Sequence, residues 1–304
     1  IIGLIFPTFL MGGFFYLKIL SNGWVKNIKK YWSYALKISL PMIPHSLGMV
    51  VLTQIDRIMI IKYIGSSEAG IYSFGFSYAV LLMLFSNAII QAFQPWLYET
   101  FKLKKFKSIK KVNNIIAASM CVLTFFIITF APEVIKILGA KDFWSAKWVV
   151  APIAMGALFQ YLSNTYSIIE LYHKKTIYIA VVSVLTAIIN FLLNITFIPI
   201  YGYVAAAFTT FVSYLIMALM HSYFYNKVTK APIFNNIFLW VITISTAIVS
   251  FIMMSLYDYF YMRYLFFLII VLSLIFFKKQ IISKIFKYGL LYLKTKDKTI
   301  FNNF

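Results

Sequence analysis

The chain has 304 residues, of which 62% are hydrophobic, 19% are aromatic and only 12% are charged. This composition lies far outside that of soluble globular domains and predicts a polytopic membrane protein. The net charge of +20 does not indicate nucleic acid as a partner, because the positive-inside rule also confines basic residues to the connections between apolar spans.

Apolar stretches follow one another along the chain, and each is long enough to cross a membrane. A helical span needs about 20 apolar residues. Scanning with this length predicts nine spans, at residues 1–20, 37–62, 70–97, 112–135, 147–169, 176–198, 203–224, 236–257 and 262–278. The chain begins inside the first of them, without an initiator Met or a cleavable signal peptide, so we expect that helix to be truncated and the sequence to be a fragment. The predicted fold class is all-α.

Lysines are distributed unevenly between the two sets of alternate connections. One set, together with the tail after residue 278, holds most of them and includes the "KKFKSIKK" stretch at 104–111. Basic residues concentrate in the cytoplasmic connections of membrane proteins. We therefore expect the lysine-rich connections and the C-terminus to be cytoplasmic, and the "KKFKSIKK" lysines to attract anionic membrane lipids.

Two adjacent charged residues, Asp56 and Arg57, stand near the outer end of the predicted span 37–62. A charge at the centre of a span costs about 2.5–3.5 kcal/mol, so such residues usually face protein, water or the interface. Arg57 is near enough to the interface to reach the headgroups, and structural and functional roles suit it equally. The side chain of Asp56 is shorter and cannot reach water at the interface as easily, which favours a functional or ion-paired role. Because neighbouring residues point about 100° apart on a helix, the two cannot face each other.

Histidines and a lysine provide further candidates. His45 shares a helical face with Asp56, and Lys37 lies two turns before it. His45 is a candidate proton-linked group, although a single His in a span more commonly serves only as a hydrogen-bonding residue. His173 and His221 fall at predicted cytoplasmic ends, where we expect them to lie in water.

Amide side chains recur on one side of several spans. Gln91 lies in the third span, and Gln160 and Asn164 lie one turn apart in the fifth. We predict that these three line a hydrated pathway. Asn190 and Asn194 in the sixth span are interpreted instead as interhelical hydrogen-bonding residues.

Sequence signatures of catalysis are absent. There is no "GxxxxGK[ST]" motif, no metal-ligand cluster and no Ser/His/Asp set. The single cysteine, Cys121, excludes an intrachain disulfide. We therefore expect no enzymatic activity and no cofactor.

The segment "KISLPMIPHSLGMVVLTQIDRIMIIKYIGSSEAGIYSFGFSYAVLL", residues 37–82, resembles the bacterial polysaccharide or O-antigen flippases of the multidrug/oligosaccharidyl-lipid/polysaccharide exporter superfamily. The shared features are a span that begins with Pro, an Asp-Arg pair near its outer end and a short loop from Gly65. "FQPWLYE", at 93–99, and "NFLLNITFIPIYGYVAAAFTT", at 190–210, also fit that family.

The resemblance implies a transporter built from two six-helix lobes. Residues 1–20 would then be the last helix of a first lobe that is missing from this sequence, and 37–224 the complete second lobe. Two additional helices would occupy 236–278, and 279–304 would form a basic cytoplasmic tail. The implied activity is the translocation of undecaprenyl-diphosphate-linked oligosaccharide across the bacterial inner membrane, for O-antigen, capsule or exopolysaccharide assembly.

The resemblance also suggests a role for each candidate. Arg57, and less directly Lys37 or His45, would attract the diphosphate. The amides of Gln91, Gln160 and Asn164 would bind sugar hydroxyls. Asp56 would support the surroundings of Arg57 or exchange a coupling ion. The alternatives are a cation-coupled drug antiporter of the same fold, a fragment that acts only as a scaffold, and a membrane-embedded glycan polymerase, whose expected large outer loop is not seen.

Overall fold

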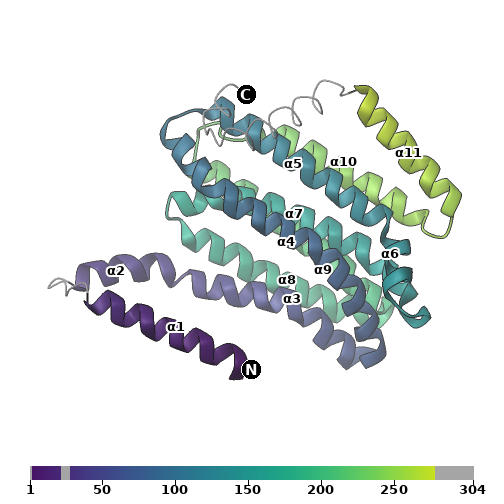
Figure 1. The fold of residues 1–304 in the computed structure, drawn as a ribbon, viewed down its shortest axis with the longest axis horizontal. Helices are drawn as coiled ribbons and strands as arrows, with labels where there is room; N and C mark the ends of the chain where they lie inside the picture. Colours follow the sequence, from purple (N-terminus) through teal and green to yellow (C-terminus); the bar gives the residue numbers. More distant parts are fainter. Residues whose placement is uncertain (1, 22–27, 278–304) are drawn as a thin grey trace. The chain divides into compact units, whose positions relative to one another are not determined.

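The computed structural model describes residues 2–21 and 28–277, and every regular element in these ranges is a helix (Figure 1). The chain divides into two compact units, Ile1–Leu40 and Pro41–Phe304. The basic tail predicted at 279–304 lies outside the described residues.

The first unit contains α1, Ile2–Ser21, and α2, Ile28–Ser39, and no residue of α2 is buried. The predicted span 37–62 is wrong at its start, because α2 ends before Pro41 and α3 begins after it. Proline disfavours helical backbone at the residue before it. Lys37 therefore belongs to α2 and not to α3, the helix that carries His45. The Lys37 side chain is exposed.

The second unit consists of helices joined mostly by short turns. They are α3 Met42–Tyr63, α4 Ser66–Lys102, α5 Phe106–Thr129, α6 Ala131–Leu138, the 3-10 helix η1 Lys141–Ala146, α7 Lys147–Tyr172, α8 Thr176–Tyr201, α9 Tyr203–Val228, α10 Asn236–Ser255 and α11 Phe260–Phe277. The spans predicted from residue 70 onward each coincide with a long helix. The predicted span 112–135 is divided between two helices, because α5 ends at Thr129 and the short helix α6 begins at Ala131, next to Pro132.

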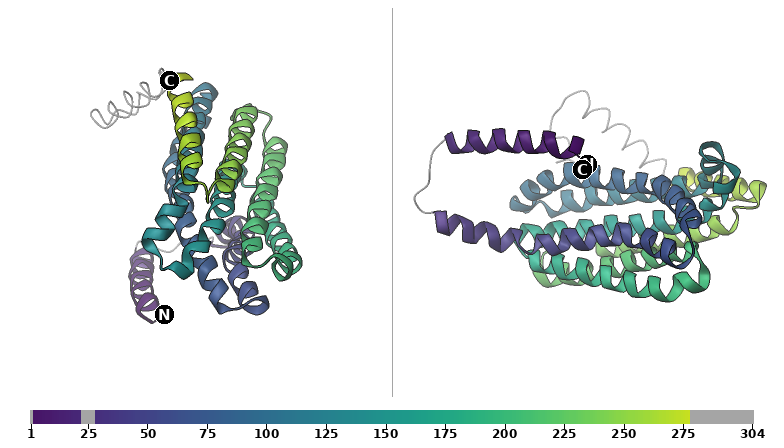
Figure 2. Two further views of the ribbon diagram at one scale, coloured as in Figure 1. Left: turned by 90° about the vertical axis from the view of Figure 1, so that its right-hand side faces the viewer. Right: turned by 90° about the horizontal axis from the view of Figure 1, so that it is seen from below.

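Helix α7 forms the core of this unit and contacts α4, α5, α9 and α10 (Figures 1 and 2). Glycines allow its neighbours to approach closely. A Cβ at Gly75 of α4 would lie 2.5 Å from the carbonyl oxygen of Ala146, and one at Gly156 of α7 would lie 3.4 Å from Cα of Phe211 in α9. The core therefore depends on backbone contact at these glycines as well as on apolar side chains.

Six helical stretches of the described residues are long and apolar enough to cross a membrane: 28–63, which includes the break at Pro41, 66–102, 106–129, 176–201, 203–228 and 236–255. Shorter apolar helices occur at Phe9–Ser21 and Phe260–Leu272. Helix α7 has the length of a span but is less apolar, which is consistent with its being shielded by other helices. The chain is a multi-pass, all-α membrane protein.

Helix α11 packs on α5 and α6. The Phe267 ring stacks on Phe125, with ring centroids 5.7 Å apart, and meets Phe130 edge-on. Arg263 is only 1% exposed and forms an ion pair with Glu133 of α6. This arginine therefore lies inside a helix–helix contact rather than at the surface.

Candidate functional site

Asp56 is the centre of a buried polar network near one end of the second unit. Its side chain is 1% exposed and accepts three hydrogen bonds from three other helices. The Tyr72 hydroxyl of α4 donates to Oδ2 at 2.5 Å, and the Thr210 hydroxyl of α9 donates to the same oxygen at 2.6 Å. The Asn194 amide of α8 donates to Oδ1 at 2.7 Å. Neutral donors thus satisfy a carboxyl group that would be costly to bury alone.

The network extends through two asparagines that the sequence analysis interpreted as interhelical hydrogen-bonding residues. The Asn194 amide also donates to Asn190 Oδ1 at 3.2 Å, and the Asn190 amide donates to Thr210 Oγ1 at 3.3 Å. The Thr209 hydroxyl donates to Asn194 Oδ1. The two asparagines do join helices, as predicted, and in addition Asn194 donates to Asp56, while Asn190 is bonded to two of the Asp56 donors.

The order of the helices explains why these residues meet. Asp56 and Asn194 lie about two turns before the ends of α3 and α8, whereas Tyr72 and Thr210 lie about two turns after the starts of α4 and α9. Because α3 and α8 are parallel and α4 and α9 begin at the end where α3 and α8 finish, all four positions fall at the same depth. This common depth is the one signal in the sequence that could have identified Tyr72, Thr209 and Thr210.

Arg57 takes no part in that network. Its guanidinium carbon lies 4.9 Å from the centroid of the Phe76 ring, and Nη1 donates to Gln54 Oε1 at 3.2 Å. The Nε–H is buried without a hydrogen-bond partner, and the side chain as a whole is half-buried. As predicted, Asp56 and Arg57 do not pair with each other. Of the two roles expected for Asp56, functional or ion-paired, the ion-paired one is not seen, since no ion pair of the described residues includes Asp56.

His45 lies toward the opposite end of α3 and is half-buried. Its Nδ1 forms a short hydrogen bond with the Ser183 hydroxyl of α8. One turn along α3, a Cβ at Gly48 would lie 3.1 Å from the Ser183 carbonyl oxygen. α3 and α8 therefore touch at both ends, through His45 at one and Asp56 at the other.

The predicted pathway residues of α7 occupy the accessible face of an otherwise buried helix. Gln160, Asn164 and Ser167 are half-buried, whereas the residues on every other side of this part of α7 are buried. These positions recur at helical spacing and so share one face. Two amides and one hydroxyl of the core helix thus lie on the side where it is open.

Gln91 of α4 is exposed and lies at about the same depth. Near their starts, α4 and α7 meet at Gly75 and Val149, and near their ends the Tyr98 hydroxyl donates to the Ile168 carbonyl at 3.0 Å. The two helices are therefore parallel. Gln91 lies two turns before Tyr98 on the same face of α4, which makes it level with the α7 residues 160–164. The structure thus brings these three predicted amides to one depth.

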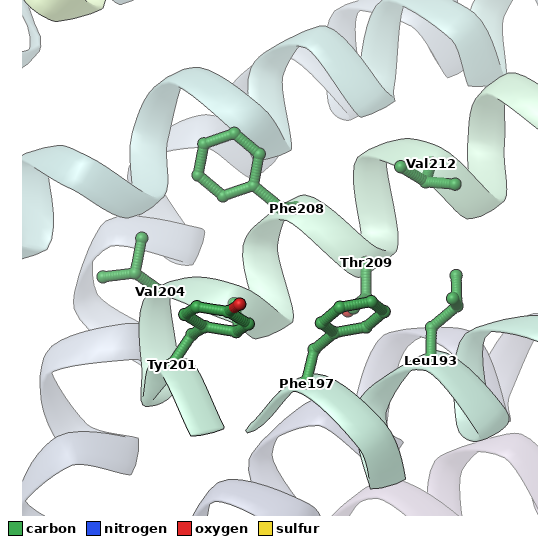
Figure 3. Close-up of a pocket in the computed structure, with 8 residues that line it drawn as sticks. Leu193, Phe197, Tyr201, Val204, Phe208, Thr209 and Val212 are labelled. Atoms are coloured by element: carbon green, nitrogen blue, oxygen red, sulfur yellow. The ribbon is translucent and has the colours of Figure 1, made fainter. Parts of the chain in front are cut away.

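An apolar groove of about 400 Å³ runs between the end of α8 and the start of α9 (Figure 3). Phe197 and Tyr201 of α8 face Phe208 and Val212 of α9 across it. Thr209 contributes to its lining and also belongs to the Asp56 network. The groove suits hydrocarbon rather than sugar, because its lining offers almost no polar surface.

His221 and Glu170 form a buried polar pair that was not predicted from the sequence. His221 of α9 is 1% exposed, and its Nδ1 lies 2.9 Å from Glu170 Oε1 of α7, which is fully buried. The prediction that His221 lies in water is wrong, because α9 continues to Val228 and leaves His221 inside the bundle. His173, the other histidine predicted to lie in water, is half-buried at the end of α7, where burial and then Lys175 lower its pKa.

The Asp56 network can hold a carboxylate in more than one state. Its hydroxyl groups can donate or accept, so the same atoms suit Asp56 with a proton or beside a hard cation, which prefers oxygen ligands. No group of three or more His, Cys, Asp or Glu that could hold a metal ion occurs within residues 2–21 and 28–277.

Residues 1–101 match the model of a family described as polysaccharide biosynthesis protein. The match includes Asp56, Arg57, Tyr72 and Gln91, and it ends before α5. The block 190–210 lies outside the matched residues, so the resemblance suggested for it from the sequence stays a prediction. No curated protein and no solved structure matches the chain.

Proposed function

We propose, from the premise that the chain is a member of this polysaccharide biosynthesis family, that it translocates a lipid-linked oligosaccharide across the bacterial inner membrane. Such a substrate joins sugars and a diphosphate to a polyprenyl chain. The sugars and diphosphate cannot cross hydrocarbon unaided, whereas the prenyl chain can remain in the lipid. A protein that performs this task needs a polar face that is reachable from the bilayer.

The observation that carries the proposal is the polar face of α7. Gln160, Asn164 and Ser167 form the accessible side of the core helix, and Gln91 of α4 lies level with them. Amides both donate and accept hydrogen bonds, so they can replace water around sugar hydroxyls. We assign the sugar pathway to this face rather than to the groove of Figure 3, whose lining is apolar.

Arg57 is the residue we assign to the diphosphate. A guanidinium group suits phosphate oxygens because its N–H groups form a planar fork. In this structure it has one side-chain acceptor, Gln54, and a ring contact, while its Nε–H is unpaired. Lys37 and His45 are weaker candidates, since Lys37 belongs to the other unit and His45 is bonded to Ser183.

We assign Asp56 to the exchange of a coupling ion, either a proton or a hard cation, through its ring of hydroxyl and amide groups. A cation-coupled antiporter would use the same carboxyl, so Asp56 alone does not separate the two functions. Loss of drug resistance rather than of surface polysaccharide in an Asp56→Asn variant would identify the antiporter. The proposal assigns no covalent chemistry and no cofactor to the chain.

The test of the proposal compares Arg57→Ala with Lys62→Ala, a matched loss of one positive charge near the same end of α3. In cells whose surface polysaccharide depends on this protein, Arg57→Ala should lower surface polysaccharide while membrane abundance stays normal. Lys62→Ala should change neither. If Arg57→Ala instead lowers abundance, Arg57 is structural and its assignment to the substrate is wrong.

A second test concerns the polar face. Cysteine placed at Gln160 or Asn164 should react with a hydrophilic thiol reagent in membranes, whereas cysteine at the buried Leu158 should not. The native Cys121 is 5% exposed and should give little background. Equal protection at all three introduced positions would place the α7 face away from water and refute the pathway.

We also propose that the lysine-rich connections face the cytoplasm, as the positive-inside rule predicts. A reporter fused in the turn after Lys102 should be active only as a cytoplasmic reporter. Activity of a periplasmic reporter at this position would show that the lysine-rich connections face the periplasm and would contradict the proposed orientation.

A further inference from the structure

A polar pocket of about 550 Å³ lies where α9 ends and α10 begins, beside the first turns of α5. Lys110 of α5 and Lys230 of the α9–α10 connection line it, together with the amides of Asn226, Asn235 and Asn236. It is separate from the Asp56 network, which lies at the opposite ends of α8 and α9.

The wall of the pocket is held in place by its own hydrogen bonds. The backbone N–H of Phe234 donates to the hydroxyl of the buried Tyr225 at 3.2 Å. The Asn236 amide donates to Asn226 Oδ1 at 3.3 Å, and Asn235 Oδ1 accepts from the N–H of Phe238 at 3.3 Å. The connection is therefore ordered before any ligand binds, which reduces the entropic cost of binding.

The charge of the pocket matches an anion. Its lining holds two lysines and no carboxylate. Within the described ranges, neither Lys110 nor Lys230 takes part in an ion pair. A ligand with a negatively charged, oxygen-rich group would supply the missing counter-charge, and the amides would supply further donors.

An apolar face of α10 continues from the pocket. Ile237 lines the pocket and is 79% exposed. Val241, Ile244 and Ile248 are also exposed and follow it at helical spacing, so they lie on the same side of α10. A pocket at the ends of two candidate membrane spans would lie at the depth of the lipid headgroups, and this face of α10 would extend into the hydrocarbon.

We propose that this pocket binds the phosphate headgroup of an anionic phospholipid of the bilayer, with the acyl chains lying along Ile237, Val241, Ile244 and Ile248. Basic pockets between helices at the cytoplasmic side are suited to anionic headgroups. Two lysines that form no ion pair with the described residues, amides that are already held in place and an adjoining apolar face together specify a site rather than a general attraction to the membrane surface.

The experiment measures binding of phosphatidylglycerol and phosphatidylcholine to the purified full chain in detergent, by native mass spectrometry at fixed salt. The pocket variant is Lys110→Gln with Lys230→Gln. Its matched control is Lys102→Gln with Lys227→Gln, which removes the same charge from neighbouring helix ends outside the pocket lining. Each lysine near an anionic lipid contributes roughly a fivefold effect, so the pocket pair should weaken phosphatidylglycerol binding about 30-fold. The control pair should weaken it less than about threefold, and phosphatidylcholine binding should be weak throughout.

Equal losses in the two double variants, or phosphatidylcholine binding as tight as phosphatidylglycerol, would overturn the proposal. So would a polyprenyl diphosphate that displaces phosphatidylglycerol from the wild type at much lower concentration, since the pocket would then be a substrate site. If the double variant fails to fold, Lys230→Gln alone should still give about a fivefold loss, because Lys230 is exposed. None of these outcomes depends on transport, so they are distinct from failure of the proposed function.

Discussion

Replacing Thr210 by Val tests whether the Asp56 network holds the bundle together. Valine has nearly the shape of threonine, so the change removes one hydroxyl and leaves little empty space. That hydroxyl donates to Asp56 Oδ2 at 2.6 Å and accepts from the Asn190 amide at 3.3 Å. The substitution therefore deprives a buried carboxyl of one of its three donors and leaves a buried N–H unpaired.

The expected loss follows from these two bonds. A hydrogen bond to a charged group contributes about 1.5–3 kcal/mol and a neutral one about 1 kcal/mol. The additional apolar contact of the valine methyl offsets up to about 0.8 kcal/mol. We expect Thr210→Val to lower the free energy of unfolding by about 2–4 kcal/mol, which corresponds to a fall of roughly 5–15 °C in apparent Tm.

The matched control is Thr186→Val. Thr186 is fully buried in α8, but its hydroxyl donates only to the Val182 carbonyl one turn back, at 2.7 Å. That carbonyl is also available to the helical backbone, so the change should cost less than about 1 kcal/mol. The assay is the fraction of protein that stays monodisperse in detergent after heating. Equal shifts in the two variants, or no shift for Thr210→Val, would refute the stabilising role of the network.

Three further predictions concern other parts of the second unit. Gly75→Ala should destabilise the protein by about 1–3 kcal/mol in the same heating assay, because its Cβ would lie 2.5 Å from a carbonyl oxygen, whereas Gly70→Ala, with its nearest atom at 3.9 Å, should not. Glu170→Leu should reduce folded yield, with a cost of about 1–3 kcal/mol, because it leaves the buried imidazole of His221 without its hydrogen-bond partner, and adding His221→Leu should recover part of the yield. The pKa of His173, measured by NMR titration, should lie below 6.5, because burial disfavours its charged form. The unfolded chain then binds more protons near pH 6, so the contribution of His173 to stability should fall as the pH drops through 6.5, and a pKa above that value would contradict the structure.

The long helices were predictable because a membrane span has a fixed minimum length and a strong composition. The breaks between helices were harder to predict. Apolar residues continue on both sides of Pro41 and of Pro132. Hydropathy alone therefore predicted one continuous span at each proline, where the structure has two helices. Proline chemistry locates α3 and α6 better than hydropathy does.

The candidate site was predicted only in part. Asp56 and the amides of Gln160 and Asn164 were found because polar side chains are rare in apolar spans. Two partners of Asp56, Tyr72 and Thr210, were not predicted, because such residues are common in apolar spans and these two meet Asp56 only through the packing of α3, α4 and α9. His221 was misplaced for a simpler reason: the predicted end of its span was four residues too short, at 224 instead of Val228.

The network around Asp56 also has a consequence for how the chain is made. Tyr72 follows Asp56 by 16 residues, whereas Asn194 and Thr210 follow it by 138 and 154. At about 5–20 residues per second, the ribosome needs roughly 7–30 seconds to supply the later two. During that interval the newly inserted α3 must keep its carboxyl group in the bilayer with Tyr72 as the one partner of this network already synthesised, which makes the α3–α4 hairpin the natural first intermediate of assembly.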